Sequence, residues 1–201
     1  MDRPQGPIVS RRRVITGGLG AALLVGAYLA WGRAGAFPPE TTPQGAYLRI
    51  VLSISQGDPR DCFAYLEDQA QHAAYSIRDY RKQAFDRVGA SYPEPERGRL
   101  LEAYREQAAA PDGADIWAVM AQKRGWIVRL RKDLSGVVKV EESGERATIE
   151  TARGTRYGFR KRKNGIWGLS IFTAELMAEA ERAARDAEVV EKAAADYERG
   201  K

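Results

Sequence analysis

Three arginines and two aromatic residues alternate near position 160 in a pattern that could build a binding face. Arg156, Arg160 and Arg162 are separated by even numbers of residues, and Tyr157 and Phe159 stand at odd positions between them. Because the side chains of a β-strand alternate between two faces, the arginines are expected on one face and the rings on the other. Guanidinium groups bind phosphate or carboxylate oxygens, and a basic residue near an anionic lipid surface gains roughly 1 kcal/mol. The run therefore predicts an anion or lipid contact.

The same arginines also fit a solvated face whose charges are neutralised within the chain. Residues 123–163 carry thirteen basic and five acidic side chains, whereas residues 37–122 and 173–201 are both acidic overall. Glu141, Glu150 and the acidic C-terminal region are the candidate partners. Exposed ion pairs contribute only about 0–1 kcal/mol, so replacing Arg160 and Arg162 is expected to change stability little. Both interpretations stay open on the sequence alone.

The net charge suggests a nucleic-acid partner, but its distribution argues against one. The chain has a net charge of +5 and a pI of about 9.4. Residues 1–36 hold five arginines and one aspartate, so the remainder carries 27 basic and 26 acidic side chains. A nearly neutral domain lacks the electrostatic footprint of a nucleic-acid binder. We therefore expect no nucleic acid among the partners.

Catalytic and metal-binding chemistry finds little support in the sequence. His72 is the only histidine and Cys62 the only cysteine, and ten residues along one helix would separate them by about 15 Å. Asp61, Asp68 and Asp79 lie on candidate helix faces, with no feature that distinguishes them from solvated carboxylates. The sequence contains no zinc-binding, phosphate-loop or nucleophile motif. We expect no metal, no cofactor and no catalytic residue, which favours a non-enzymatic role.

An uncharged, mostly apolar run from Val14 to Gly32 follows three arginines at positions 11–13. About 18 helical residues span roughly 27 Å, close to the hydrocarbon thickness of a bilayer. Ala34 and Ala36 form a small-residue cleavage pattern just after the run. Residues 1–36 are therefore expected to be either a single-pass membrane anchor or a cleaved signal, with the arginines on the cytoplasmic side.

Residues 10–15 resemble a bacterial twin-arginine export signal. Arg11 and Arg12 match its paired arginines, and Val14 and Ile15 match its two apolar positions. Val14 stands where phenylalanine is usual, and Thr16 where lysine is frequent. The resemblance implies a protein held in the bacterial inner membrane with its domain in the periplasm, or a periplasmic protein after cleavage.

A linker and a single α+β domain are predicted beyond this segment. The proline-rich residues 37–43 form the linker, and residues 44–201 form the domain. Apolar residues at three- and four-residue spacing predict several amphipathic helices. The expected helical ranges are 43–56, 59–89, 96–109, and 114–132 with a break at Gly125.

Four short strands and a long C-terminal helix complete the predicted domain. Three glycine-containing turns separate the strands, which is typical of hairpins, so the expected sheet is an antiparallel four-stranded meander. Thr173 is expected to cap the helix, with Phe172 and Met177 as a hydrophobic staple. The apolar seam of the helix is expected to pack on its own domain, with a coiled-coil contact to another envelope protein as the alternative. The expected strands are 137–142, 146–152, 156–163 and 166–172.

This order of elements resembles the nuclear transport factor two-like superfamily, a cystatin-like roll with a cone-shaped cavity. The features that carry the resemblance are the first helix, the turn at 56–58, the segment 63–66 and the late strand at 165–169. Catalytic members of the superfamily use an acid or a histidine inside the cone. The helices over 96–132 and the C-terminal helix depart from the family pattern and could fill the cavity.

These observations favour an exported or membrane-anchored envelope protein with a non-enzymatic binding or assembly domain. Its expected partners are the membrane and a second envelope protein at the C-terminal helix. The alternative is a small-molecule enzyme that uses a buried carboxylate in the roll cavity. A buried carboxylate facing a large pocket would favour that alternative.

Overall fold

The computed structural model describes residues 37–200, and Pro38–Lys201 form a compact unit of their own. The predicted export signal at Arg11, Arg12, Val14 and Ile15, and the cleavage pattern at Ala34 and Ala36, lie outside the described residues. Within the described part of the chain, no helix is both long enough and apolar enough to cross a membrane.

The first helix among the described residues, α2 (Pro43–Gln56), confirms the predicted bounds. Thr42 caps it by accepting a hydrogen bond from the Gly45 N–H at 3.1 Å. Gly57 ends it with a φ of 89°, a left-handed conformation that glycine adopts without steric cost.

The single helix predicted over residues 59–89 is wrong. The chain instead forms a short 3-10 helix, η1 (Pro59–Tyr65), and then the helix α3 (Asp68–Ser91). Between them, Leu66 forms a β-bridge with Leu169 of the sheet. This bridge requires extended backbone, so it interrupts the helix.

Three shorter helices follow, and their bounds agree with the predicted ranges to within one residue. They are α4 (Glu96–Ala108), α5 (Gly113–Lys123) and α6 (Trp126–Asp133). Gly125 has a φ of 67° and separates the last two, which confirms the predicted break.

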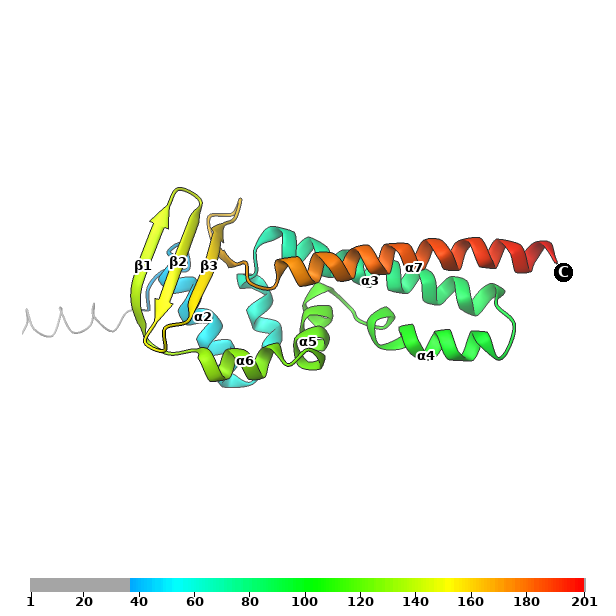
Figure 1. The fold of residues 1–201 in the computed structure, drawn as a ribbon, viewed down its shortest axis with the longest axis horizontal. Helices are drawn as coiled ribbons and strands as arrows, with labels where there is room; N and C mark the ends of the chain where they lie inside the picture. The colour runs from blue at the N-terminus through cyan, green and yellow to red at the C-terminus, as the bar shows by residue number, and fades with distance from the viewer. Residues whose placement is uncertain (1–36, 201) are drawn as a thin grey trace, which may run out of the picture. The chain divides into compact units, whose positions relative to one another are not determined.

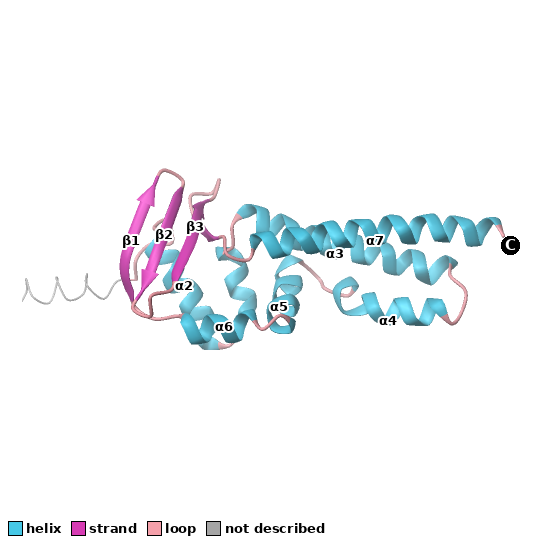
Figure 2. Ribbon diagram, in the orientation of Figure 1, coloured by secondary structure: helices cyan, strands magenta, loops and turns pink. Residues whose placement is uncertain are grey.

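A four-stranded antiparallel sheet in meander order confirms the predicted β region (Figure 1 and Figure 2). The third and fourth strands are shorter than predicted, so Arg162 lies just beyond the end of its strand. The inner face carries buried side chains that belong to the main hydrophobic core with the surrounding helices. The strands are β1 (Val137–Ser143), β2 (Arg146–Thr151), β3 (Arg156–Lys161) and β4 (Trp167–Leu169).

The last helix, α7 (Thr173–Arg199), packs on its own domain as predicted, and it does so along α3. Its predicted cap is wrong. Phe172, not Thr173, occupies the cap position, and no side chain caps the helix there. Phe172 is buried, with its ring centroid 5.1 Å from that of Trp117, whereas Met177 is exposed. The packing of Phe172 into the core therefore replaces the staple.

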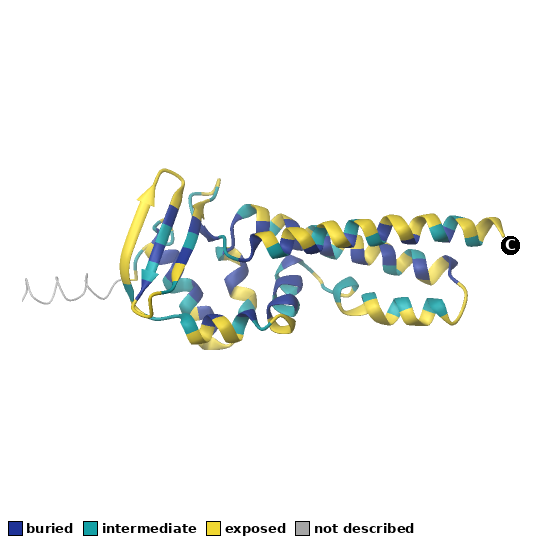
Figure 3. Cartoon of the chain, in the orientation of Figure 1, coloured by how far each residue is buried: buried dark blue, intermediate teal, exposed yellow. Residues whose placement is uncertain are grey.

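Two hydrophobic cores lie within this unit. The main core gathers α2, η1, α5, α6, the sheet and the facing parts of α3 and α7. A smaller core joins the C-terminal parts of α3 and α7 with α4 (Figure 3). Its buried residues are Ala84, Val88, Tyr92, Ala187, Val190 and Ala194.

Candidate anion-binding site

Arg156 is separate from the other two arginines predicted to contact an anion. Its guanidinium donates to Glu141 Oε2 at 2.9 Å, which is one of the internal pairings that the sequence suggested. The alternation predicted for β3 is confirmed as far as the strand extends, with Tyr157 and Phe159 buried and Arg156 and Arg160 exposed. Arg156 is therefore part of a solvated ion pair.

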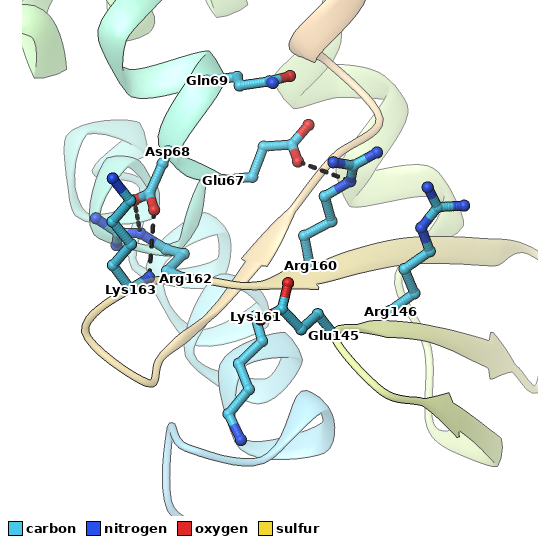
Figure 4. Close-up of a pocket in the computed structure, with 9 residues that line it drawn as sticks. All are labelled: Glu67, Asp68, Gln69, Glu145, Arg146, Arg160, Lys161, Arg162 and Lys163. Carbon is cyan, nitrogen blue, oxygen red and sulfur yellow. Dashed lines mark hydrogen bonds and ion pairs between the residues drawn. The ribbon is translucent and has the colours of Figure 1, made fainter.

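Arg160 and Arg162 line a surface groove of about 430 Å³ (Figure 4). The groove is bounded by the first turn of α3, the turn between β1 and β2, and the end of β3. Five cationic and three anionic side chains line it, so its net charge is positive. The lining residues are Glu67, Asp68, Gln69, Glu145, Arg146, Arg160, Lys161, Arg162 and Lys163.

Within the groove, Arg162 has a structural role. Its guanidinium donates to Asp68 Oδ1 at 2.7 Å and to Gln71 Oε1 at 2.9 Å. A third hydrogen bond goes to the carbonyl oxygen of Ala64 at 2.5 Å. Burial opposes the ionisation of Asp68, but the hydrogen bonds from Arg162 and the Lys163 N–H outweigh it and lower the pKa of Asp68. Arg162 therefore holds the end of β3 against α3, and its donors are already in use.

Arg146 and Arg160 stand directly opposite each other on β2 and β3. Side chains in such positions have Cβ atoms about 4.5–5.5 Å apart, where like charges destabilise a sheet. Figure 4 shows both side chains extending from the sheet in the same general direction, while Lys161 extends the other way. Glu67 Oε2 lies 3.5 Å from Arg160 Nε, and Arg146 has no ion pair among the described residues. Two guanidinium groups thus face one groove, and of the two only Arg160 has an ion pair there, with Glu67.

Among the three carboxylates that line this groove, Glu67 is the one that pairs with Arg160, and it is only 5% exposed. Its N–H donates to the carbonyl oxygen of Leu169 at 3.2 Å. A Cβ added to Gly168 would lie 2.5 Å from the Glu67 Cα, so the two backbones touch and glycine is required there. The close approach fixes Glu67 next to Arg160.

The Arg162→Ser variant should be less stable than the Arg160→Ser variant, which corrects the expectation that both arginines are dispensable. Loss of Arg162 leaves several partly buried acceptors unpaired and should lower the free energy of unfolding by about 1–3 kcal/mol. Loss of Arg160 breaks a single ion pair of 3.5 Å, in which the arginine is half-exposed and Glu67 is buried, and should cost about 1 kcal/mol. Chemical denaturation of the two single variants measures the difference. Equal losses would contradict the structural role of Arg162.

Cys62 and His72 offer no catalytic pair. Burial raises the pKa of the Cys62 thiol to about 12, so it stays protonated at neutral pH. His72 is exposed on α3, in a different element from Cys62. Among residues 37–200, no cluster of three or more histidine, cysteine or acidic side chains could hold a metal ion.

No family model matches the sequence, and no curated protein or solved structure resembles it. The likeness to the nuclear transport factor two-like superfamily and the twin-arginine signal therefore stay predictions.

Proposed function

We propose that this chain is a non-enzymatic binding protein of the bacterial envelope, whose groove takes an anionic group of its ligand. The proposed location rests on residues 1–36, as an anchor in the inner membrane or as a signal removed in the periplasm. One observation supports the binding role: the opposed pair of Arg146 and Arg160 beside a groove with excess positive charge.

An oxyanion between the two arginines would turn their repulsion into attraction. Guanidinium groups present N–H donors in a planar fork that matches phosphate and carboxylate oxygens. The start of α3 lies at the same groove and adds the partial positive charge of a helix N-terminus. The ligand class is therefore a phosphate or carboxylate, either free or in a lipid headgroup.

Thermal unfolding of the full chain in a non-ionic detergent tests this proposal. Inorganic phosphate should raise the Tm above its value in chloride of equal ionic strength, because a ligand that binds the folded state stabilises it. The Arg146→Ser and Arg160→Ser variants should lose this rise. Glycerol 1-phosphate, the soluble part of an anionic lipid headgroup, should raise the Tm further if a lipid is the source.

Arg156→Ser is the matched control, because Arg156 is another exposed arginine on β3 and lies outside the groove. This variant should keep the full response to phosphate. In chloride alone, Arg146→Ser should be as stable as the natural chain or slightly more so, since a like-charge pair is removed. A response to phosphate that all three variants share would reject the site.

An enzyme remains a second candidate because Glu67 is a buried carboxylate that lines the groove. In the roll that the sequence resembles, the catalytic cavity lies against the concave face of the sheet. Here large side chains, among them Tyr157 and Phe159, are buried on the inner face. The groove beside α3 is thus the place where an enzymatic role would be sought, with Glu67→Gln as the diagnostic variant.

A partner at the C-terminal helix is also proposed, at the side of α7 that α3 leaves open. The seam residues Leu176, Ala183 and Val190 are buried within this unit. Val189 is among the exposed residues of the helix. A second protein would therefore contact this outer side and not the seam.

A further inference from the structure

β1 is an edge strand of the sheet, and no described strand other than β2 pairs with it. It is seven residues long, and all but its first residue are exposed (Figure 3). Its single neighbour among the described strands is β2, whereas the opposite edge, β4, is covered by the bridge from Leu66 to Leu169. An uncovered edge presents backbone N–H and C=O groups that can pair with another strand.

The two faces of β1 differ in chemistry. Val140 stands opposite the buried Ile149 of β2, so it belongs to the inner face of the sheet, yet it is 39% exposed. Lys139 and Glu141 lie on the outer face, where they form an exposed ion pair of 2.6 Å with each other and Glu141 also accepts from Arg156. Along β1, a cation therefore directly precedes Val140 and an anion directly follows it.

We propose that a second copy of this chain pairs with β1, antiparallel, about a twofold axis at Val140. In this register Val140 faces Val140 of the second copy, and Lys139 of each copy faces Glu141 of the other. Opposite charges in directly opposed positions stabilise a sheet, and the contact occurs twice by symmetry. The two sheets join into one of eight strands with both inner faces on the same side.

The charges of β1 favour the axis at Val140 over axes at the adjacent residues. An axis at Lys139 would oppose two lysines, and an axis at Glu141 would oppose two glutamates, each of which destabilises the pairing. A register displaced by a single residue would place the inner face of one sheet beside the outer face of the other. The Val140 axis is the arrangement in which the charges of β1 are complementary to themselves.

Cross-linking of single-cysteine variants tests the axis position in the full chain, purified in a non-ionic detergent. Val140→Cys should give a covalent dimer with a short bis-maleimide, because the two positions face each other. Val138→Cys is the matched control, since Val138 is more exposed than Val140 but would lie about 14 Å from its copy along paired strands. The natural Cys62 is buried and protonated, so the unmodified chain provides the background.

Charge reversal in the Val140→Cys background then distinguishes two roles for the charges of β1. They either stabilise pairing with a second copy or keep the edges of two monomers apart. Lys139→Glu and Glu141→Lys, each alone, should reduce the cross-linked fraction about fivefold or more, and the double swap should restore it. Circular dichroism melting would show that each variant stays folded. Equal cross-linking at positions 138 and 140, a dimer indifferent to the single reversals, or the absence of a dimer at Val140 would each overturn the proposal.

Discussion

Replacing Arg81 with alanine should lower the free energy of unfolding by about 3 kcal/mol, because it breaks a buried ion pair, although Glu179 keeps its contacts with Arg124 and Arg182. The Arg81 side chain on α3 is 7% exposed. Its Nη2 lies 3.3 Å from Glu179 Oε1 and its Nη1 lies 2.6 Å from Asp186 Oδ2, both on α7. Its Nε–H donates to Gln107 Oε1 of α4 at 3.0 Å. It also stacks over the ring of Tyr104 at 5.2 Å. One side chain therefore connects three helices.

Lys82→Ala is the matched control for this prediction. Lys82 is the next residue on α3, and its ion pair with Asp86 is exposed on both sides, so its loss should cost about 0–1 kcal/mol. The Glu179→Ala and Arg81→Ala changes should be less than additive, with a coupling of about 1–3 kcal/mol. Urea denaturation of the two single variants and the double variant measures this. Additive losses, or an Arg81 variant as stable as the Lys82 variant, would refute the network.

This network lies between the two hydrophobic cores along α3 and α7. Arg81 follows Ile77 of the main core and precedes Ala84 of the smaller core. On α7, Glu179 and Asp186 likewise lie between Leu176 of the main core and Ala187 of the smaller one. Alanine-rich seams pack in several registers with similar energy, whereas a buried charge tolerates only the register that supplies its partner. We infer that Arg81 fixes how the two helices align.

The sequence predicted most of the helices and strands because their signals are local. Pro43 and Gly57 bound α2, and Gly125 separates α5 from α6, where backbone conformation alone sets the limits. The two helix predictions that failed have tertiary causes. The helix over 59–89 breaks because Leu66 pairs with Leu169, about a hundred residues away in sequence. The cap of α7 differs because Phe172 packs into the aromatic core.

The candidate site was only partly predictable. The alternation of side chains between the two faces of β3 predicted the position of Arg160 but not that of Arg162, because β3 ends at Lys161. Arg146 was missed, although the short turn between β2 and β3 contained a signal, since a tight hairpin sets which residues stand opposite each other. Glu67 could not be found in this way, because its place beside Arg160 depends on the non-local contact with β4.

Export of the chain should depend on the arginine pair near its N-terminus, with a large loss of periplasmic protein when the pair is replaced. The decisive variant is Arg11→Lys combined with Arg12→Lys, which keeps both charges and removes the paired guanidinium groups. Single substitutions are less informative because Arg13 can complete a new pair with Arg12. A reporter fused after residue 201 measures the periplasmic fraction, and Arg3→Lys is the control outside the motif.

The outcome distinguishes two physical origins of the orientation. An anchor oriented by charge alone responds to the number of basic residues on its cytoplasmic side, which the double lysine variant preserves. A twin-arginine signal requires the guanidinium groups themselves, so the same variant should hold the reporter in the cytoplasm while the Arg3→Lys control exports it normally. If the double variant reaches the periplasm at the natural level, the twin-arginine interpretation is wrong, and the apolar run from Val14 to Gly32 is an ordinary anchor or signal.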